Sequence, residues 1–399
     1  MGDLAEIVGG GTPSTSIDLY WDGEIDWYAP AEIGDQIYLE SSQRKITEEG
    51  LNKSSAKMLP VGTVLFTSRA GIGKTAILQK ESCTNQGFQS IVPNKVKLDS
   101  YFIFTRSEEL KRYGETVGAG STFVEVSGKQ MANMELMMPM TMQEQQKIGA
   151  YFSKIDHLIT LHQRKCEDTK KLKKYMLQKM FPQNGSKVPE IRFKGFTDDW
   201  EQRKLGEICS RIQGNDGRME LPILTISAGN GWMKQEDRFS GNIAGKEQKN
   251  YTLLKKGELS YNHGNSKLAK YGTVFSLQTY EEALVPRVYH SFKIENGNAN
   301  FIEYYFATKL PDRELGKLIS SGARMDGLLN IGYDDFMGIS LLLPKTQEQN
   351  HIAGYFRIFD RLITLHHRKL ICVKNALKFT QNDIIREKII TINVLLTGG

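Results

Sequence analysis

Cysteine is scarce in this 399-residue sequence: there are four, and no two of them form a CxxC pair. This scarcity argues against a disulfide framework and a cysteine-based zinc site, so we expect a protein of the reducing cytoplasm. Long apolar runs are also missing, because stretches such as 339–343 and 389–396 are far shorter than the roughly twenty residues that a membrane helix needs. The amino terminus lacks a basic segment followed by an apolar one, so we expect neither a secretory signal nor a membrane partner.

The common catalytic and metal-binding motifs are absent as well. The sequence contains no GxSxG elbow, no HExxH helix, no EF-hand loop and no cluster of histidine with cysteine. Its carboxylates occur as isolated loop residues or as charges on helix faces, which is typical of a solvated surface. The glycine-rich start at 9–11 lacks the GxGxxG spacing of a dinucleotide-binding turn. No reacting group can therefore be singled out.

One stretch, SRAGIGKTAI at 68–77, contains the GKT that ends a phosphate-binding loop. The complete pattern needs a glycine five residues before Gly73, but Ser68 stands there. The preceding PVGTVLFTS predicts a strand, whereas the residues that follow are too short and interrupted for the helix of such a loop. A nucleotide hydrolase is therefore the disfavoured alternative.

The strongest feature of the sequence is an internal repeat. QEQQKIGAYFSKIDHLITLHQRK, which begins at 143, matches QEQNHIAGYFRIFDRLITLHHRK, which begins at 347. Pro139 and Pro344 precede the two copies in equivalent places. Further upstream, LAEI at 4–7 parallels LGEI at 205–208, and PVGTVLFTS at 60–68 parallels LKKGELSYN at 254–262. We therefore predict two copies of one unit, each a strand-rich region followed by a long helix.

Each repeated helix has apolar residues spaced by four and three, which is the spacing of a coiled-coil seam. The predicted packing residues are Ile148, Phe152, Ile155, Ile159 and His162 in the first copy, and Ile352, Phe356, Phe359, Ile363 and His366 in the second. We interpret the two histidines as polar residues that set helix register rather than as ligands or bases. A helix from 143 to 181 would extend nearly 60 Å at about 1.5 Å per residue.

The strand-rich regions contain short alternating runs, such as KMLPVGTVLFTS and LPILTIS, separated by clusters of Gly, Asn and Ser. This pattern predicts mixed α+β recognition domains rather than a doubly wound sheet. The net charge of +6 is mildly basic and compatible with an acidic partner such as nucleic acid. The lysine-rich KKLKKYMLQK at 170–179 is more typical of a solvated helix face than of a nucleic-acid patch.

The two repeated helices, the two prolines and the lead-in VPEIRFKGFTDDWEQRKLGEI at 188–208 resemble the specificity subunit, HsdS, of type I restriction-modification systems. The resemblance covers almost the entire chain. It implies an α/β (mixed α+β) fold with a pseudo-twofold repeat, in which two target recognition domains are separated by two long antiparallel coiled-coil helices. The resulting domains are a first recognition domain at 1–140, a central helix at 141–183, a second recognition domain with its lead-in at 184–343, a distal helix at 344–382 and a divergent tail at 383–399.

The resemblance also implies a function. The chain would be a non-catalytic subunit that reads a bipartite sequence in double-stranded DNA, one half-site per recognition domain. It would bind no cofactor itself and would dock two modification subunits, which use S-adenosylmethionine to methylate adenine. Restriction (motor) subunits could join them and use ATP and Mg. The rival from another class is a coiled-coil protein-interaction scaffold that never touches DNA.

Two stretches of the recognition domains supply candidate DNA contacts, because arginine suits guanine, asparagine suits adenine and lysine suits phosphate. The candidates are Ser68, Arg69, Lys74 and Thr75 in the first copy, and Asn262, His263, Asn265, Lys267 and Lys270 in the second. The alternative for each is a polar turn residue without a DNA contact, and the sequence leaves both open.

The chain departs from the family pattern at both ends. The first copy starts at MGDLAEI, whereas the second has the lead-in from 188 to 204 before its LGEI, so we expect a first recognition domain shortened at its start. After Leu377 the distal helix loses its similarity to the proximal one. Either change could impair subunit docking.

Overall fold

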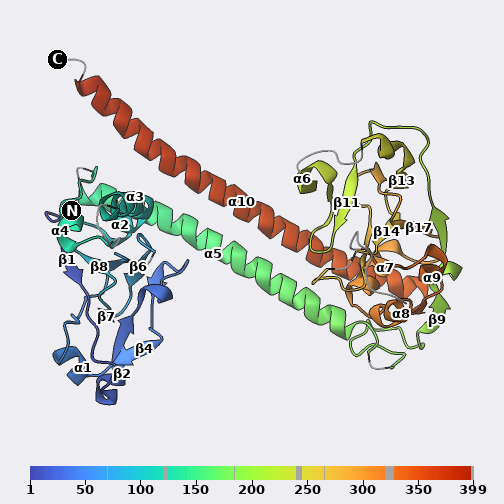
Figure 1. The fold of residues 1–399 in the computed structure, drawn as a ribbon, viewed down its shortest axis with the longest axis horizontal. Coiled ribbons are helices and arrows are strands. Elements are labelled where there is room, and N and C mark those ends of the chain that lie inside the picture. The colour runs from blue at the N-terminus through green and yellow to red at the C-terminus, as the bar shows by residue number, and fades with distance from the viewer. Residues whose placement is uncertain are drawn as a thin grey trace. The chain divides into compact units, whose positions relative to one another are not determined.

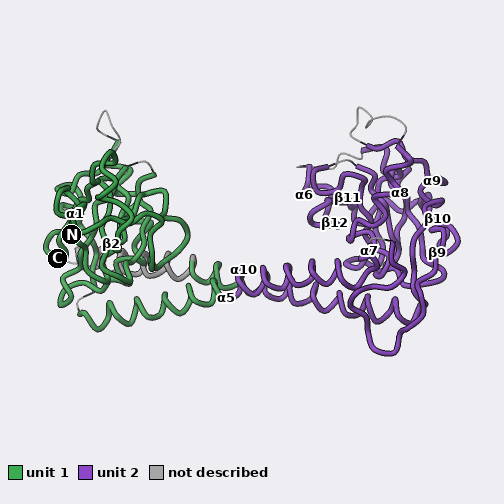
Figure 2. The backbone as a smooth tube through the Cα atoms, turned by 90° about the horizontal axis from the view of Figure 1, so that it is seen from below, with its two compact units in different colours: residues 1–161, 372–399 green, residues 162–371 purple. Residues whose placement is uncertain are grey.

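The computed structural model describes residues 1–69, 71–119, 125–139, 141–183, 185–239, 245–264, 266–319 and 328–396, with the backbone alone at 246 and 378–396. The chain divides into two compact units, residues 1–161 with 372–399 and residues 162–371 (Figure 2). These divisions fall inside both long helices, whereas the domain boundaries predicted from the sequence lie at the helix ends. Each unit therefore combines one strand-rich region with part of each repeated helix.

The first unit contains a five-stranded and a three-stranded sheet, with short helices between the strands (Figure 1). In spatial order the first sheet is β1 (Ala5–Gly9), β8 (Gln89–Pro93), β5 (Val64–Phe66), β6 (Thr75–Leu78) and β3 (Tyr38–Leu39), and the second is β4 (Arg44–Ile46), β2 (Trp21–Tyr28) and β7 (Cys83–Thr84). The helical elements are η1 (Asp18–Tyr20), η2 (Pro30–Glu32), α1 (Glu48–Asn52), α2 (Ser100–Thr105), α3 (Ser107–Gly118), α4 (Gly128–Ala132) and the long α5 (Met142–Lys179), which continues into the second unit.

The second unit contains a four-stranded sheet and three strand pairs. The sheet has the order β10 (Cys209–Ile212), β17 (His290–Ile294), β14 (Leu259–Asn262) and β15 (Thr273–Ser276), and the pairs are β11 (Leu224–Ser227) with β12 (Gly231–Lys234), β13 (Thr252–Lys255) with β16 (Glu282–Val285), and β18 (Ser340–Leu343) with β9 (Glu201–Lys204). The helical elements are η3 (Leu205–Glu207), α6 (Gln235–Phe239), η4 (Gly245–Asn250), α7 (Ala299–Ala307), α8 (Asp312–Lys317), α9 (Tyr333–Met337) and the long α10 (Thr346–Leu396).

The two units share one sheet topology despite their divergent sequences. The order β1-β8-β5-β6 in the first corresponds to β10-β17-β14-β15 in the second. All neighbours within these two sets pair antiparallel. The mixed α/β fold and its internal repeat are thus as predicted.

The sheets are held in place by helices that cover one apolar face. In the first unit, Val64 and Phe66 of β5 are fully buried against α2 and α3, which contribute Phe102 and Leu110. In the second, Tyr261 of β14 stacks on Phe336 of α9 with ring centroids 4.2 Å apart. Burial of these aromatic rings supplies much of the hydrophobic stabilisation of each unit.

The two long helices begin where the prolines predict, but the second extends further than expected. α5 spans Met142–Lys179, close to the predicted 143–181, whereas α10 continues to Leu396 through most of the predicted divergent tail at 383–399. No proline or glycine follows Gly354 until Gly398, so the sequence contains no residue that would end the helix earlier. Among the described residues, no helix carries an apolar stretch sufficient to cross a membrane.

Candidate nucleic-acid interface

The GKT loop is the turn of a β-hairpin. It joins β5 to β6, which pair antiparallel, so a strand follows it and not a helix. The Thr67 N–H donates to Lys74 O, and the Gly73 N–H donates to Thr67 O, each with an N···O distance of 3.0 Å. Gly71 and Gly73 have φ of 99° and 96°, which glycine adopts without strain. A phosphate loop needs the free N–H groups of a helix amino terminus, so this geometry agrees with the rejection of a nucleotide site.

The candidates on this hairpin differ in exposure. Ser68 is fully buried, and its N–H donates to Gly87 O at 2.8 Å. This burial corrects the prediction that Ser68 contacts DNA, because the side chain has no surface. Thr75 is half-buried, with Oγ1 2.6 Å from Ser107 Oγ, which is a packing contact between β6 and α3.

The two basic candidates of the first hairpin do reach the surface. Arg69 is partly exposed and lies 3.8 Å from Glu125. Lys74 is exposed, although its Nζ donates to Ile33 O at 2.9 Å. Both contacts are weak enough at the surface to be exchanged for a phosphate or a base edge.

The equivalent hairpin of the second unit joins β14 to β15. Asn262 fixes its base: Nδ2 donates to Ile226 O at 3.1 Å, and Oδ1 accepts from the Gly264 N–H at 3.0 Å. Asn262 therefore has a turn-stabilising role, the alternative that the sequence left open. Lys267 and Lys270 are exposed, as a DNA contact requires. Asn265 lies outside the described residues.

His263 is a buried structural residue rather than an exposed contact. Its Nδ1 lies 2.7 Å from Leu329 O and its Nε2 2.9 Å from Val288 O. This position corrects the prediction that His263 reads DNA. A neutral imidazole has one N–H and can donate to one of these carbonyls, whereas a protonated ring donates to both.

A cavity of ≈ 720 Å³ lies beside His263 and was missed by the sequence analysis. His290 stacks on His263 with ring centroids 5.0 Å apart. Burial lowers the pKa of His290, and the nearby His263 and Arg211 lower it further. Arg211 lies 4.2 Å from the Tyr333 ring, and the exposed Arg287 completes the basic lining. These residues come from separate strands and loops, so no local sequence pattern could have linked them.

The ten predicted packing residues lie on the less exposed side of each long helix. Phe152, Ile155, Ile352, Phe356 and Phe359 are buried, and the other five are half-buried. His162 and His366 meet across the helix pair, with an Nδ1–Nδ1 distance of 3.1 Å. Further along, Lys173 Nζ lies 2.5 Å from Asp360 Oδ1, so the two helices run antiparallel as predicted.

The repeated glutamine of the QEQ motif fastens each long helix to its recognition region. Gln145 Oε1 accepts from the Asp99 N–H at 3.1 Å, where Asp99 caps α2. Gln349 Oε1 accepts from the Asn298 N–H at 3.0 Å, where Asn298 caps α7. Because the same contact occurs in both units, it accounts for the retention of this glutamine in both copies.

A repeated aspartate makes a second shared contact. Tyr101 OH donates to Asp156 Oδ2 at 2.8 Å, and Tyr304 OH donates to Asp360 Oδ2 at 2.6 Å. Burial, with the adjacent carboxylates, raises the pKa of both tyrosines, so they remain hydrogen-bond donors. The two aspartates occupy equivalent places in the repeated motif.

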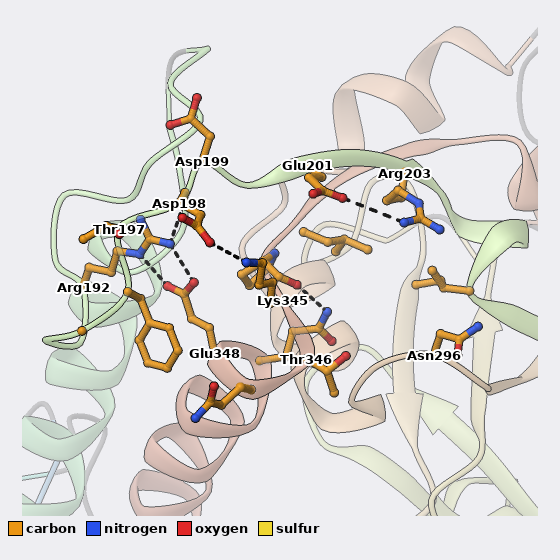
Figure 3. A pocket seen from close by; sticks show the side chains of 17 residues that line it. Arg192, Thr197, Asp198, Asp199, Glu201, Arg203, Asn296, Lys345, Thr346 and Glu348 are labelled. Atoms are coloured by element: carbon orange, nitrogen blue, oxygen red, sulfur yellow. Dashed lines mark hydrogen bonds and ion pairs between the residues drawn. The ribbon is translucent and has the colours of Figure 1, made fainter.

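The lead-in segment lines a polar cavity of ≈ 580 Å³ at the start of α10 (Figure 3). The Arg192 guanidinium donates to both Glu348 oxygens, at 2.7 and 2.8 Å. Lys345 Nζ donates to Asp198 at 2.6 Å, and this bond holds the pKa of Asp198 below its usual range. These charged residues, which line the cavity, are therefore paired with one another. Among the described residues, no group of three His, Cys, Asp or Glu could hold a metal ion.

Replacing both His162 and His366 by leucine is expected to raise the thermal midpoint at low pH. Burial lowers the pKa of His366, followed by the charges of His162, Lys165 and Lys369. The folded chain then binds a proton less readily than the unfolded chain, so stability falls as the pH drops below the ordinary histidine value of about 6.5. Thermal denaturation at about pH 8 and about pH 5.5 measures this difference.

The double leucine variant should lose part of this pH dependence, because its helix seam no longer titrates. His157 is exposed on the same α5, so His157→Leu serves as the matched control and should leave the pH dependence unchanged. If the thermal midpoint of the double variant changed as much between the two pH values as that of the native chain, the pH dependence would not come from His162 and His366.

The comparisons with known proteins point to one family. A family profile described as "Type I restriction modification DNA specificity domain" matches residues 1–170 and 197–375. The MjaIX specificity subunit of Methanocaldococcus jannaschii is 32% identical over 223 residues, which cover 54% of this chain and 51% of that protein. The EcoR124I/EcoR124II specificity subunit of Escherichia coli is 26% identical over 166 residues, 40% of each chain. The chain thus spans about half the length of these relatives, at 51% and 40%.

A solved structure shares the fold. The type I restriction-modification S subunit from M. genitalium superposes with a TM-score of 0.59, at 12% identity over 95% of this chain and 93% of that chain. At this identity the similarity concerns the fold alone.

Proposed function

Because the chain belongs to the family of type I restriction-modification DNA specificity subunits, we propose that it reads a bipartite DNA target, one half-site per strand-rich region. In this role it is not catalytic. It works in the cytoplasm, where its two recognition regions contact double-stranded DNA and its helices fix the gap between the half-sites.

The shared sheet topology is the observation that carries this proposal. Both regions place a hairpin at the same point of the sheet, between β5 and β6 or between β14 and β15. Each hairpin presents exposed basic side chains, Lys74 in one and Lys267 with Lys270 in the other. One scaffold with two different basic turns suits a protein that reads two different half-sites.

The partners follow from the same premise. Two modification subunits would dock on the two equivalent halves, since a pseudo-twofold protein offers the same surface twice. They would bring S-adenosylmethionine, while restriction subunits would bring ATP and Mg. The chain itself would contribute the helices and the polar lead-in surface.

Replacing Lys267 and Lys270 by alanine is expected to weaken DNA binding of the assembled complex. Each lost phosphate contact reduces the slope of log affinity against log salt by about 0.9, so the two together reduce it by up to about 1.8. Fluorescence anisotropy over a salt series measures the slope. A Lys255→Ala, Lys256→Ala variant removes two exposed lysines at the end of β13 and should retain the native slope.

An unchanged slope in the hairpin variant would show that this turn does not contact the phosphate backbone. A uniform loss across DNA sequences would assign these lysines to positioning, whereas relaxed preference at one half-site would assign them to base reading.

Methylome sequencing tests the function itself. The chain would be expressed with a cognate modification subunit in a host that lacks other adenine methylation. We expect methyladenine in a split motif, two short defined parts separated by a fixed gap. No new methylation, with the modification subunit shown to be competent alongside a complete specificity subunit, would overturn the proposal for this chain and favour the DNA-free scaffold.

A further inference from the structure

A further cavity of the second unit, with a volume of ≈ 770 Å³, is lined by β15, the β11–β12 turn, α7 and α10. α10 contributes Arg357, Arg361 and Arg368 to this lining. Spacings of four and eleven residues place the three arginines on one face of the helix, because eleven residues complete about three turns. All three are exposed. The cavity therefore has a row of positive charges that extends over roughly 16 Å of α10.

The two carboxylates in the lining do not neutralise this row. Glu303 Oε2 accepts from the Ser276 N–H at 2.9 Å and from Ser276 Oγ at 2.5 Å. Asp360 accepts from Tyr304 OH at 2.6 Å and lies 2.5 Å from Lys173 Nζ. Both carboxylates are thus held by other groups. Within the described part of the chain, neither forms an ion pair with the arginines of the cavity.

The rest of the lining supplies neutral hydrogen-bonding groups. Asn230, Gln278 and Asn300 contribute side-chain amides. The Nε1–H of Trp232 has no hydrogen-bond partner among the residues that the structure describes. Guanidinium, amide and indole groups together offer many donors, so the ligand that fits is negatively charged and rich in acceptor oxygens. A phosphate group has both properties.

In the first unit a fifth strand stands at the corresponding place. β3 pairs with β6, and the Ile77 N–H donates to Ile37 O at 2.7 Å. Ile77 of β6 and Ser276 of β15 occupy equivalent register positions in the shared sheet topology. The Ser276 N–H donates to the Glu303 carboxylate instead. The edge of β15 beside the cavity therefore carries a side chain where β6 carries a strand.

The long helices differ at the same place. Arg357 and Arg361 align with Ser153 and His157 of the first copy, although the motif around them is nearly identical. In the first unit Ser153 interacts with Tyr38 of β3. Two of the three arginines are therefore specific to the copy in which the cavity borders the edge strand.

The cavity is continuous with the hairpin that carries Lys267 and Lys270. A methyl group added at Gly229 in the β11–β12 turn would lie 3.3 Å from Leu268 Cδ1 of the hairpin loop, and the next residue, Asn230, lines the cavity. β15 leads from the hairpin to the cavity within four residues, about 13 Å. One extended polyanion can therefore reach both the lysines and the arginines, which favours DNA over a free nucleotide or an acidic peptide.

We propose that this cavity is a phosphate-binding site for the DNA backbone beside the half-site that the second unit reads. Its arginines bind phosphate groups through charge-assisted hydrogen bonds, which carry no sequence information and hold the recognition region in register on the duplex. The proposal rests on the function proposed above. It adds a DNA contact made by the long helix rather than by a hairpin.

Replacing Arg361 and Arg368 by glutamine in the assembled complex tests the site. The probe is a duplex with the split motif found by methylome sequencing, and fluorescence anisotropy over a salt series gives the slope of log affinity against log salt. We expect this slope to fall by up to about 1.8, with the methylated motif unchanged. The matched control, Lys369→Gln with Lys374→Gln, removes two exposed lysines of α10 that do not line the cavity and should keep the native slope.

Duplexes with uncharged methylphosphonate linkages locate the contact. The linkages are introduced in blocks on either side of each half-site. We expect one block to weaken binding of the native complex but not that of the arginine variant, because the variant has already lost the partners of those phosphates. Losses of equal size in both complexes at every block would overturn the site.

The remaining outcomes separate this site from the function on which it rests. An unchanged salt slope in the arginine variant, with the methylated motif intact, would overturn the site alone. Absence of any methylated motif with the native chain would remove the proposed function, and the site with it. Labelled ATP that binds the native chain but not the variant would assign the cavity to a free nucleotide. Loss of assembly with the modification subunit, seen by size-exclusion chromatography, would assign it to a protein partner.

Discussion

Replacing Phe181 with alanine is expected to reduce the unfolding free energy of the second unit by about 3–5 kcal/mol. Phe181 follows the end of α5 and is fully buried. Its ring centroid lies 5.9 Å from Trp200, 5.4 Å from Phe301 and 6.1 Å from Phe356. These rings belong to the lead-in, α7 and α10, so one side chain joins three elements that lie between the second recognition region and the helix pair.

The loss of unfolding free energy should lie at the upper end of this range, because the cavity left by the Phe181 ring cannot collapse easily. Three elements surround the side chain, and each is fixed by its own contacts. Urea denaturation followed by tryptophan fluorescence reports this loss, since Trp200 contacts the substituted ring. Tyr175→Ala, at an exposed position of α5, should change the free energy of unfolding by less than about 0.5 kcal/mol. A loss below about 1 kcal/mol for Phe181→Ala would contradict the role given to this ring.

Replacing Arg192 with alanine is expected to reduce the unfolding free energy by about 3–5 kcal/mol, because it would leave the Glu348 carboxylate buried and unpaired. The side chains of Arg192 and Glu348 are 11% and 2% exposed. The bidentate pair is largely shielded from solvent, so water replaces the guanidinium poorly. Amide exchange of the lead-in should accelerate in the variant, because the Arg192–Glu348 ion pair is the buried charged link from this segment to α10.

The neighbouring ion pair provides a matched control. Lys345 and Asp198 join the same two segments, but their side chains are 75% and 64% exposed. Lys345→Ala should therefore cost less than about 1 kcal/mol. An Arg192→Leu, Glu348→Leu double variant should recover much of the stability lost in Arg192→Ala, since an apolar pair leaves no buried charge. Equal losses for Arg192→Ala and Lys345→Ala would show that burial does not decide the strength of these pairs.

The candidate DNA-contact residues show why a sequence identifies a surface loop more readily than the individual side chains that could contact DNA. Ser68 and Arg69 are adjacent, yet Ser68 is buried and Arg69 reaches the surface. Asn262 and His263 are also adjacent, yet Asn262 stabilises the turn and His263 is buried in the core. Lys267 and Lys270 are exposed, since the long charged side chain of lysine is costly to bury. Serine, asparagine and histidine can satisfy their hydrogen bonds inside a protein, so their type does not predict their exposure.

The sequence by itself determined the family, the two copies and the helix pair, because identical motifs and a seam of period 3.5 are local properties of the chain. Only the tertiary structure decided that the divergent regions share one sheet order, that His263 is a core residue and that Arg211 and Arg287 line one cavity. Strand pairing and cavity lining bring together residues far apart in the chain, and no local period records such contacts.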